Sequence, residues 1–168
     1  MAAPAVLAME ACGSGQDSFP VEIGFVLPDG QSYSILIRPA AAWTQRYADA
    51  ALIHAVLLQT LLAHGRAAAE VATQLNERLH GLTLYCDRWE PASVWLQMLF
   101  EAAGLIPSFR LDNLRELLTE REAAFWDILK TQVTTEMRLQ RRRASSEAKS
   151  AQRTLMRLRA PLPDPPNR

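Results

Sequence analysis

The stretch AVLAMEACGSGQDSFPVEIGFVLPDGQSYSILIRP, residues 5–39, decides the fold of this chain because it predicts three consecutive strands. Val6–Glu10 is a short apolar run that ends in a carboxylate, and Val21–Leu27 is a second apolar run. In Ser32–Arg38, apolar and polar residues alternate, as they do in a strand with one buried face. Pro28–Gln31 lies between the last two runs and favours a tight turn, so these two strands form a hairpin.

The remainder of the chain predicts helices that alternate with short strands. Apolar residues at helical spacing indicate the helices, and β-branched residues near 132–135 indicate a break in the last one. The expected helices span 47–62, 67–79, 92–103, 113–119 and 120–159. Asp112 is the expected cap of the helix over 113–119, and the expected strands span 82–85 and 109–111. This order predicts an α/β fold in which helices cover a mixed sheet.

The totals of the chain indicate one globular domain. With 168 residues, 49% hydrophobic and 21% charged, the chain can bury a substantial core, and we expect the domain to span residues 1–159. Four of the ten prolines fall in residues 160–168, which predicts a disordered tail. No apolar run reaches membrane-spanning length and no basic region precedes an apolar leader, so we expect a cytoplasmic protein with no membrane partner.

The two cysteines, Cys12 and Cys86, are too few for a disulfide framework and fit a reducing compartment. Both follow strands that should be neighbours in the sheet. A disulfide, or a metal site shared with His54, is therefore one alternative, and buried free thiols are the ordinary one.

Charge is distributed unevenly along the chain, although the formal net charge is zero. Residues 1–137 contain 9 Lys/Arg and 16 Asp/Glu, whereas residues 138–168 contain 9 Lys/Arg and 2 Asp/Glu. Within the basic segment Arg138–Arg159, an apolar stripe at helical spacing predicts one buried face, made by Ala144, Ala148, Ala151, Leu155 and Leu158. The basic residues on the other faces either pair with the acidic body of the protein or face nucleic acid.

The first strand and the hairpin together resemble the opening of the DEDDh 3′–5′ exonucleases of the ribonuclease-H-like fold. In that family, a strand that ends in Asp-x-Glu precedes a strand that contains Glu-Ile-Gly, which Glu22-Ile23-Gly24 matches here. The Asp of the first motif is replaced by Ala8, and its Glu is Glu10. The resemblance implies a ribonuclease-H-like mixed five-stranded sheet flanked by helices.

Later segments resemble the same family and extend the match over roughly residues 5–156. Asp87–Leu96 resembles the second motif, whose metal-binding Asp is Ala92 here. Arg142–Ala148 resembles the third motif, His-x-Ala-x-x-Asp-Ala, with Arg142 in place of the general-base His and Glu147 in place of the Asp. The segment around His54 resembles the one that packs beside the terminal nucleotide.

The resemblance implies an exonuclease site that has lost most of its catalytic set, namely the positions Ala8, Glu10, Ala92, Arg142 and Glu147. The family holds two divalent metals between four carboxylates, and the metals activate water and neutralise the attacked phosphate. Only Glu10 and Glu147 remain as acids, and an arginine cannot accept a proton as a general base. We therefore expect neither catalysis nor a cofactor, and any metal that did bind would be held by Glu10 and Glu147.

Arg142 has a specific expected role. Two carboxylates that face each other without a metal repel, and burial increases the cost of keeping both ionised. A guanidinium at the former base position would supply a fixed positive charge. We therefore expect an ion pair between Arg142 and Glu10 or Glu147.

Three hypotheses for function follow from these patterns. The first is an inactive exonuclease-like protein that binds single-stranded DNA or RNA, or another macromolecule, through His54, Arg141, Arg143 and Lys149. The second is a rewired nuclease that holds magnesium or manganese with Glu10, Glu147, Asp87 and Glu90. The third is a protein-interaction scaffold, such as a homodimer, with no role in nucleic-acid binding.

Overall fold

A five-stranded sheet forms the centre of the computed structural model, which describes residues 2–13, 18–46 and 55–161. The strand order is β3-β2-β1-β4-β5, and the strands span Ala5–Ala11 (β1), Pro20–Val26 (β2), Ser32–Leu36 (β3), Thr83–Cys86 (β4) and Arg110–Asn113 (β5). β2 is antiparallel to β1 and β3, whereas β4 is parallel to both β1 and β5. The predicted mixed five-stranded sheet is confirmed.

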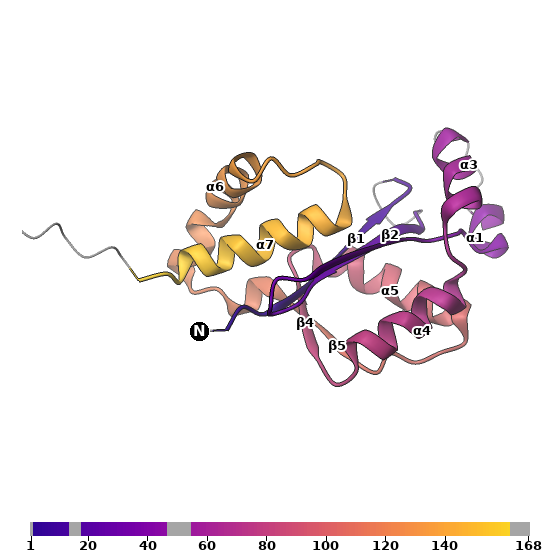
Figure 1. Ribbon diagram of the computed structural model, residues 1–168, viewed down its shortest axis with the longest axis horizontal. Helices are drawn as coiled ribbons and strands as arrows, with labels where there is room; N and C mark the ends of the chain where they lie inside the picture. The colour runs from indigo at the N-terminus through magenta and orange to yellow at the C-terminus, as the bar shows by residue number, and fades with distance from the viewer. Residues whose placement is uncertain (1, 14–17, 47–54, 162–168) are drawn as a thin grey trace, which may run out of the picture.

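Helices cover both faces of this sheet (Figure 1). α4 (Ala68–Leu79) and α5 (Trp89–Ala103) lie on one face, and α7 (Ala144–Leu158) lies on the other face beside α6 (Glu120–Glu136). The short helices α1 (Ala41–Arg46) and α3 (Ala55–His64) lie at one end of the sheet, and the 3-10 helix η1 (Leu114–Leu117) follows β5.

The alternation of side chains along β1 divides the interior into two cores. Leu7 and Met9 belong to the core shared with α4 and α5, whereas Val6 and Ala8 belong to the core beneath α7. Trp126 of α6 completes this second core. Because helices cover both of its faces, β1 is apolar on both sides, as strands buried between two layers usually are.

α7 approaches β2 closely because residue 24 has no side chain. A Cβ atom at Gly24 would lie 2.3 Å from Ser145 N and 2.4 Å from the carbonyl carbon of Ala144, which is much closer than atoms can pack. Four residues of the predicted buried stripe are confirmed, since Ala144, Ala148, Ala151 and Leu155 are each at most 1% exposed, and the fifth, Leu158, is partly buried.

The break in the last helical segment lies at residues 137–143, so its prediction near 132–135 is wrong. The hydroxyl groups of Thr131, Thr134 and Thr135 donate to the carbonyl oxygens four residues earlier, at 2.8–3.0 Å. These bonds accommodate β-branched residues within α6.

Where a helix was expected over 113–119, the chain forms only the short 3-10 helix η1. The prediction that Asp112 caps it is wrong. The cap is Asn113, whose side-chain oxygen accepts a hydrogen bond from Arg115 N at 3.0 Å. Cys12 and Cys86 are buried free thiols, so the alternative disulfide is not formed.

Some expectations fall on residues 47–54 and 162–168, which lie outside the described residues. They include the first part of the helix expected over 47–62, the position of His54 and nearly all of the tail expected over 160–168. Among the described helices, none is long and apolar enough to cross a lipid bilayer.

Candidate functional site

Most of the predicted site positions come together near the ends of β1 and β4 and the first turn of α7. Ala8, Ala92 and Glu147 line a small hollow together with Asp87. The free volume of this hollow is about 10 Å³, which is near the lower limit for one water molecule. Glu10 does not line the hollow, although its neighbour Met9 does, and the charge of the Glu10 carboxylate interacts with that of Glu147.

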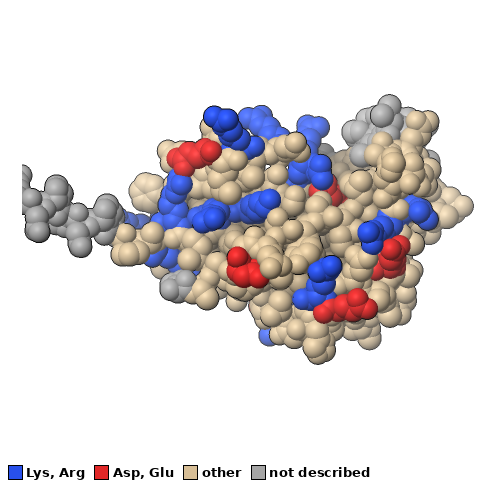
Figure 2. Space-filling model, viewed as in Figure 1, with Lys and Arg blue, Asp and Glu red and all other residues tan. Residues whose placement is uncertain are grey.

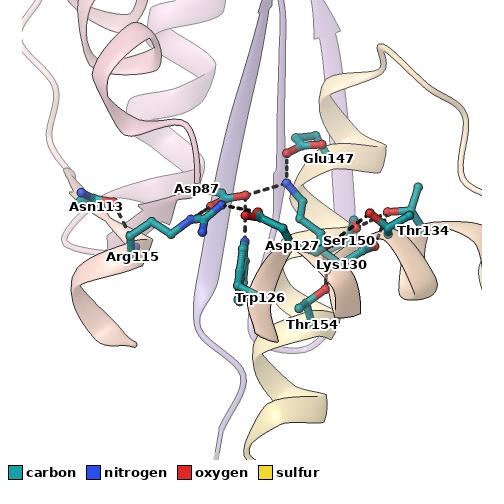
Figure 3. A network of polar contacts seen from close by, with 11 residues as sticks. Asp87, Asn113, Arg115, Trp126, Asp127, Lys130, Thr134, Glu147, Ser150 and Thr154 are labelled. Carbon is teal, nitrogen blue, oxygen red and sulfur yellow. Dashed lines mark hydrogen bonds and ion pairs between the residues drawn. The ribbon is translucent and has the colours of Figure 1, made fainter. Parts of the chain in front are cut away.

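A lysine that belongs to none of the motifs lies at the centre of this site (Figure 3). Lys130, from α6, donates to Asp87 Oδ2 at 2.6 Å and also to Glu147 Oε1. The Lys130 side chain is 15% exposed and the Asp87 side chain is 4% exposed. The ammonium group therefore bridges two carboxylates from different elements, with little access for water.

Asp87 binds two further donors besides Lys130. Arg115 Nε donates to its Oδ1 at 2.5 Å, and the indole N–H of Trp126 donates to its Oδ2 at 3.2 Å. Arg115 also donates to Asp127 Oδ1 at 2.9 Å, and its guanidinium lies over the Trp126 ring. Both oxygens of the buried carboxylate are thus satisfied, as a buried charge requires.

These interactions keep the buried groups ionised. Burial alone would raise the pKa of Asp87, but Lys130 and Arg115 hold that pKa below its ordinary value. Burial alone would lower the pKa of Lys130, but Glu147 and Asp87 raise it above its ordinary value. Asp87 and Lys130 are therefore charged at neutral pH, and together with Glu147 they form a triad.

Glu10 is in a different situation, because it makes no ion pair within the part of the chain that the structure describes. Burial raises its pKa above the ordinary value of 4.5, and the charge of Arg88 opposes that shift. The carboxylates of Glu147 and of Glu22, its cross-strand neighbour, raise the pKa further, and Arg142 lowers it slightly. The Glu10 carboxylate is therefore poorly compensated when it is ionised.

The donor set does not fit a pair of metal ions. Ala8 and Ala92 supply no oxygen ligand, and Asp87 and Glu147 already bind an ammonium group whose charge opposes a divalent cation. Within residues 2–13, 18–46 and 55–161, no group of three or more His, Cys, Asp or Glu side chains could hold a metal ion. Glu90 is exposed in the first turn of α5 and does not line the hollow.

The prediction that Arg142 forms an ion pair with Glu10 or Glu147 is wrong. Arg142 is exposed, has a left-handed φ of 55°, and forms no ion pair with any residue that the structure describes. Glu147 pairs with Lys130 instead.

The sequence did contain a signal for Lys130. Trp126, Lys130 and Val133 follow the i, i+4, i+7 spacing of one helix face, and Trp126 and Val133 are buried. A lysine within such an apolar stripe requires carboxylate partners, because an unpaired buried charge is very costly.

Arg143, one of the predicted nucleic-acid contacts, helps to anchor α7 on the sheet. Its Nε donates to Glu22 Oε1 at 3.2 Å, and the same oxygen accepts from Ala144 N at 3.2 Å and from Ser34 Oγ at 2.6 Å. A carboxylate at a helix N-terminus also interacts favourably with the helix dipole. Glu22 therefore fixes the start of α7 above β2.

The remaining basic residues of α7 and of the preceding loop form a basic surface on one side of the molecule (Figure 2). We define this basic surface by the residues of α7 and of the preceding loop that make no ion pair in the described part of the chain, namely Arg138, Arg141, Arg142, Lys149 and Arg153. Arg157 and Arg159 differ from them because they pair with Glu136 and Glu122. The predicted contacts Arg141 and Lys149 belong to the basic surface, and His54 lies outside the described residues.

Comparisons with known proteins identify the fold. No protein-family model and no curated protein matches this chain. The zinc-bound form of the E. coli ExoI–ssDNA complex is similar in structure, with a TM-score of 0.58 and 13% identity over 95% of this chain. The exonuclease domain of Mopeia virus, partially complexed with manganese, has a TM-score of 0.45 and 12% identity, and the match covers 92% of this chain and 77% of the viral one. The chain spans 41% of the ExoI chain, and the first likeness shows an exonuclease-like fold.

Proposed function

We propose that this chain is an exonuclease-fold domain that does not hydrolyse nucleic acid and that binds a single strand through its basic surface. The observation that carries this proposal is the ammonium group of Lys130 between Asp87 and Glu147. It supplies a positive charge among carboxylates of the kind that hold metals in nucleases of this fold.

A tethered ammonium group supports the fold but does not replace a catalytic metal. A catalytic metal binds a water molecule, lowers its pKa and neutralises charge on the attacked phosphate. An ammonium group only donates hydrogen bonds, and Lys130 directs them to Asp87 and Glu147. Arg142, at the position of the family's general base, carries a permanent positive charge.

The basic surface supports the binding half of the proposal. Its cations have no carboxylate partner in the described chain, so phosphate groups can bind them without breaking an ion pair. ExoI, which is similar in fold, is known in a complex with single-stranded DNA, and this complex is why we choose a single strand as the ligand.

Two measurements test the two halves separately. With magnesium or manganese, the protein should leave 5′-labelled DNA and RNA oligonucleotides at full length on a denaturing gel. At low salt, fluorescence anisotropy should detect binding of the same oligonucleotides. Metal-dependent shortening that disappears in Glu10→Gln would overturn the proposal that the protein does not hydrolyse nucleic acid. The absence of binding at low salt would overturn the proposal that it binds a single strand.

A further inference from the structure

A second, larger hollow lies between α6 and the loop at residues 137–143, and its volume is about 540 Å³. The charged residues that line it are Lys130, Arg138, Arg141 and Asp127. This volume falls in the range of pockets that bind small ligands, about 300–1,000 Å³. The hollow is therefore large enough for a nucleotide, unlike the small one between Ala8 and Glu147.

The lining of this hollow favours an anion. Arg138 and Arg141 form no ion pair with a described residue, whereas the Asp127 carboxylate is already paired with Arg115. Three threonines also line the hollow, but their hydroxyl groups donate to carbonyl oxygens of α6 itself. The two guanidinium groups are therefore the donors that remain available to a ligand.

The backbone places Arg138 at the C-terminal end of α6. Arg138 has a left-handed φ of 50°, its N–H donates to Thr135 O at 3.1 Å, and the N–H of Leu139 donates to Thr134 O at 3.1 Å. This pair of hydrogen bonds is a common way for a helix to end. The helix end therefore fixes the backbone from which the Arg138 side chain extends at the hollow.

We propose that this hollow binds a terminal phosphate monoester of a single-stranded nucleic acid, with Arg138 and Arg141 as its ligands. The inference deepens the proposed function and rests on it. Planar guanidinium groups bind phosphate through paired hydrogen bonds. A terminal monoester carries nearly two negative charges and three free oxygens, whereas an internal diester carries one charge, so a concave site with two free guanidinium groups favours the end of a strand.

The experiment compares one oligonucleotide in three forms: with a 5′-phosphate, with a 3′-phosphate and with hydroxyl groups at both ends. At a fixed salt concentration, a phosphate at one end should strengthen binding about tenfold. Hydrogen bonds to charged groups change binding affinity by factors of about this size. The variant Arg138→Gln/Arg141→Gln should bind all three forms equally.

The matched control is Lys149→Gln/Arg153→Gln, which removes two charges from the same basic surface but leaves the hollow unchanged. This control should weaken binding of all forms by the same factor and keep the preference for the terminal phosphate. Two results would overturn the phosphate-binding role of the hollow while the proposed function stands. They are equal binding of all forms by the wild type, and a preference that survives in Arg138→Gln/Arg141→Gln. No binding of any form overturns both.

Discussion

At the scale of single residues, Lys130 explains how the carboxylates of Asp87 and Glu147 can share one largely buried site. Its ammonium group compensates Asp87, which is almost fully buried, and Glu147, which comes from a distant part of the chain. A buried ion pair adds little net stability compared with apolar packing, but loss of one partner leaves an uncompensated charge. The role of Lys130 can therefore be measured by removing it.

Lys130→Met should lower the free energy of unfolding by about 3–5 kcal/mol, because Asp87 and Glu147 lose their shared cation. Urea denaturation at pH 7 measures the change. The control is Lys149→Met, which removes a lysine without an ion pair from the basic surface and should change stability by less than about 0.5 kcal/mol. Equal effects of the two substitutions would show that the triad does not stabilise the fold.

Replacement of Glu10 should stabilise the fold, whereas replacement of Lys130 should destabilise it. Its pKa is raised above 4.5, so the folded state binds a proton more tightly than the unfolded state does. The stability that comes from this proton is present below about pH 4.5 and is lost as the pH rises through the raised pKa. At pH 7 the ionised carboxylate therefore destabilises the fold, and Glu10→Gln should remove this effect.

Thermal denaturation at two pH values tests this expectation. Glu10→Gln should raise the Tm at pH 7 and should leave it nearly unchanged at pH 4, where the wild-type carboxyl is largely protonated. Glu77→Gln, an exposed position in α4 with no ion pair to a described residue, serves as the control at both pH values. A lower Tm for Glu10→Gln at pH 7 would mean that Glu10 stabilises the fold through its charge.

At the scale of secondary-structure elements, the position of α7 depends on Gly24 and Glu22 of β2. Gly24→Ala should destabilise the protein by at least about 1–3 kcal/mol, because the new Cβ would overlap the backbone at Ala144 and Ser145. Differential scanning calorimetry measures the loss. Gly13→Ala is the matched control, since nothing lies within 4 Å of a Cβ there, and a similar loss in both variants would contradict the close approach of α7.

The elements that the sequence predicts well are those whose pattern is local. The hairpin of β2 and β3 and the stripe of α7 follow from alternation and helical spacing within one segment. The break after α6 could not be placed in the same way. The threonine hydroxyls bond within α6, and Val133 packs in the interior, so the helix continues through these residues in spite of their low helix preference.

The sequence located part of the candidate site through segments that resemble exonuclease motifs. The positions of Ala8, Ala92 and Glu147 follow from motif spacing, and the structure brings them together around one hollow. Lys130 lies in no motif, and it reaches Asp87 from 43 residues away along the chain. Its pairing depends on how α6 packs beside α7, which is a tertiary contact that local spacing does not specify.

At the scale of the whole molecule, the uneven charge along the chain becomes a basic surface over α7 and its preceding loop (Figure 2). Part of the excess charge is used internally, since Arg143, Arg157 and Arg159 pair with Glu22, Glu136 and Glu122. The basic charge of the C-terminal segment therefore has two roles: some residues dock the helix, and others remain available to a polyanion.

This division predicts which arginines control the salt dependence of binding. A single strand releases about 0.7 counterion for each phosphate that a cation contacts, so contacts from the three residues of the basic surface that do not bind the terminal phosphate, Arg142, Lys149 and Arg153, would give a slope of log Kd against log salt near 2.1. Lys149→Gln/Arg153→Gln should lower that slope by about 1.4. Arg143→Gln should leave the slope nearly unchanged, because its guanidinium is paired with the buried carboxylate of Glu22.

Anisotropy titrations with an oligonucleotide that has hydroxyl groups at both ends measure these slopes without a contribution from a terminal phosphate. Arg143→Gln should instead lower the Tm, because Glu22 loses a partner at the start of α7 while it keeps Ser34 and Ala144. A flatter slope for Arg143→Gln than for Lys149→Gln/Arg153→Gln would mean that the strand contacts the start of α7 rather than its exposed length. That outcome would place the binding site of the strand nearer to Glu10 and the small hollow.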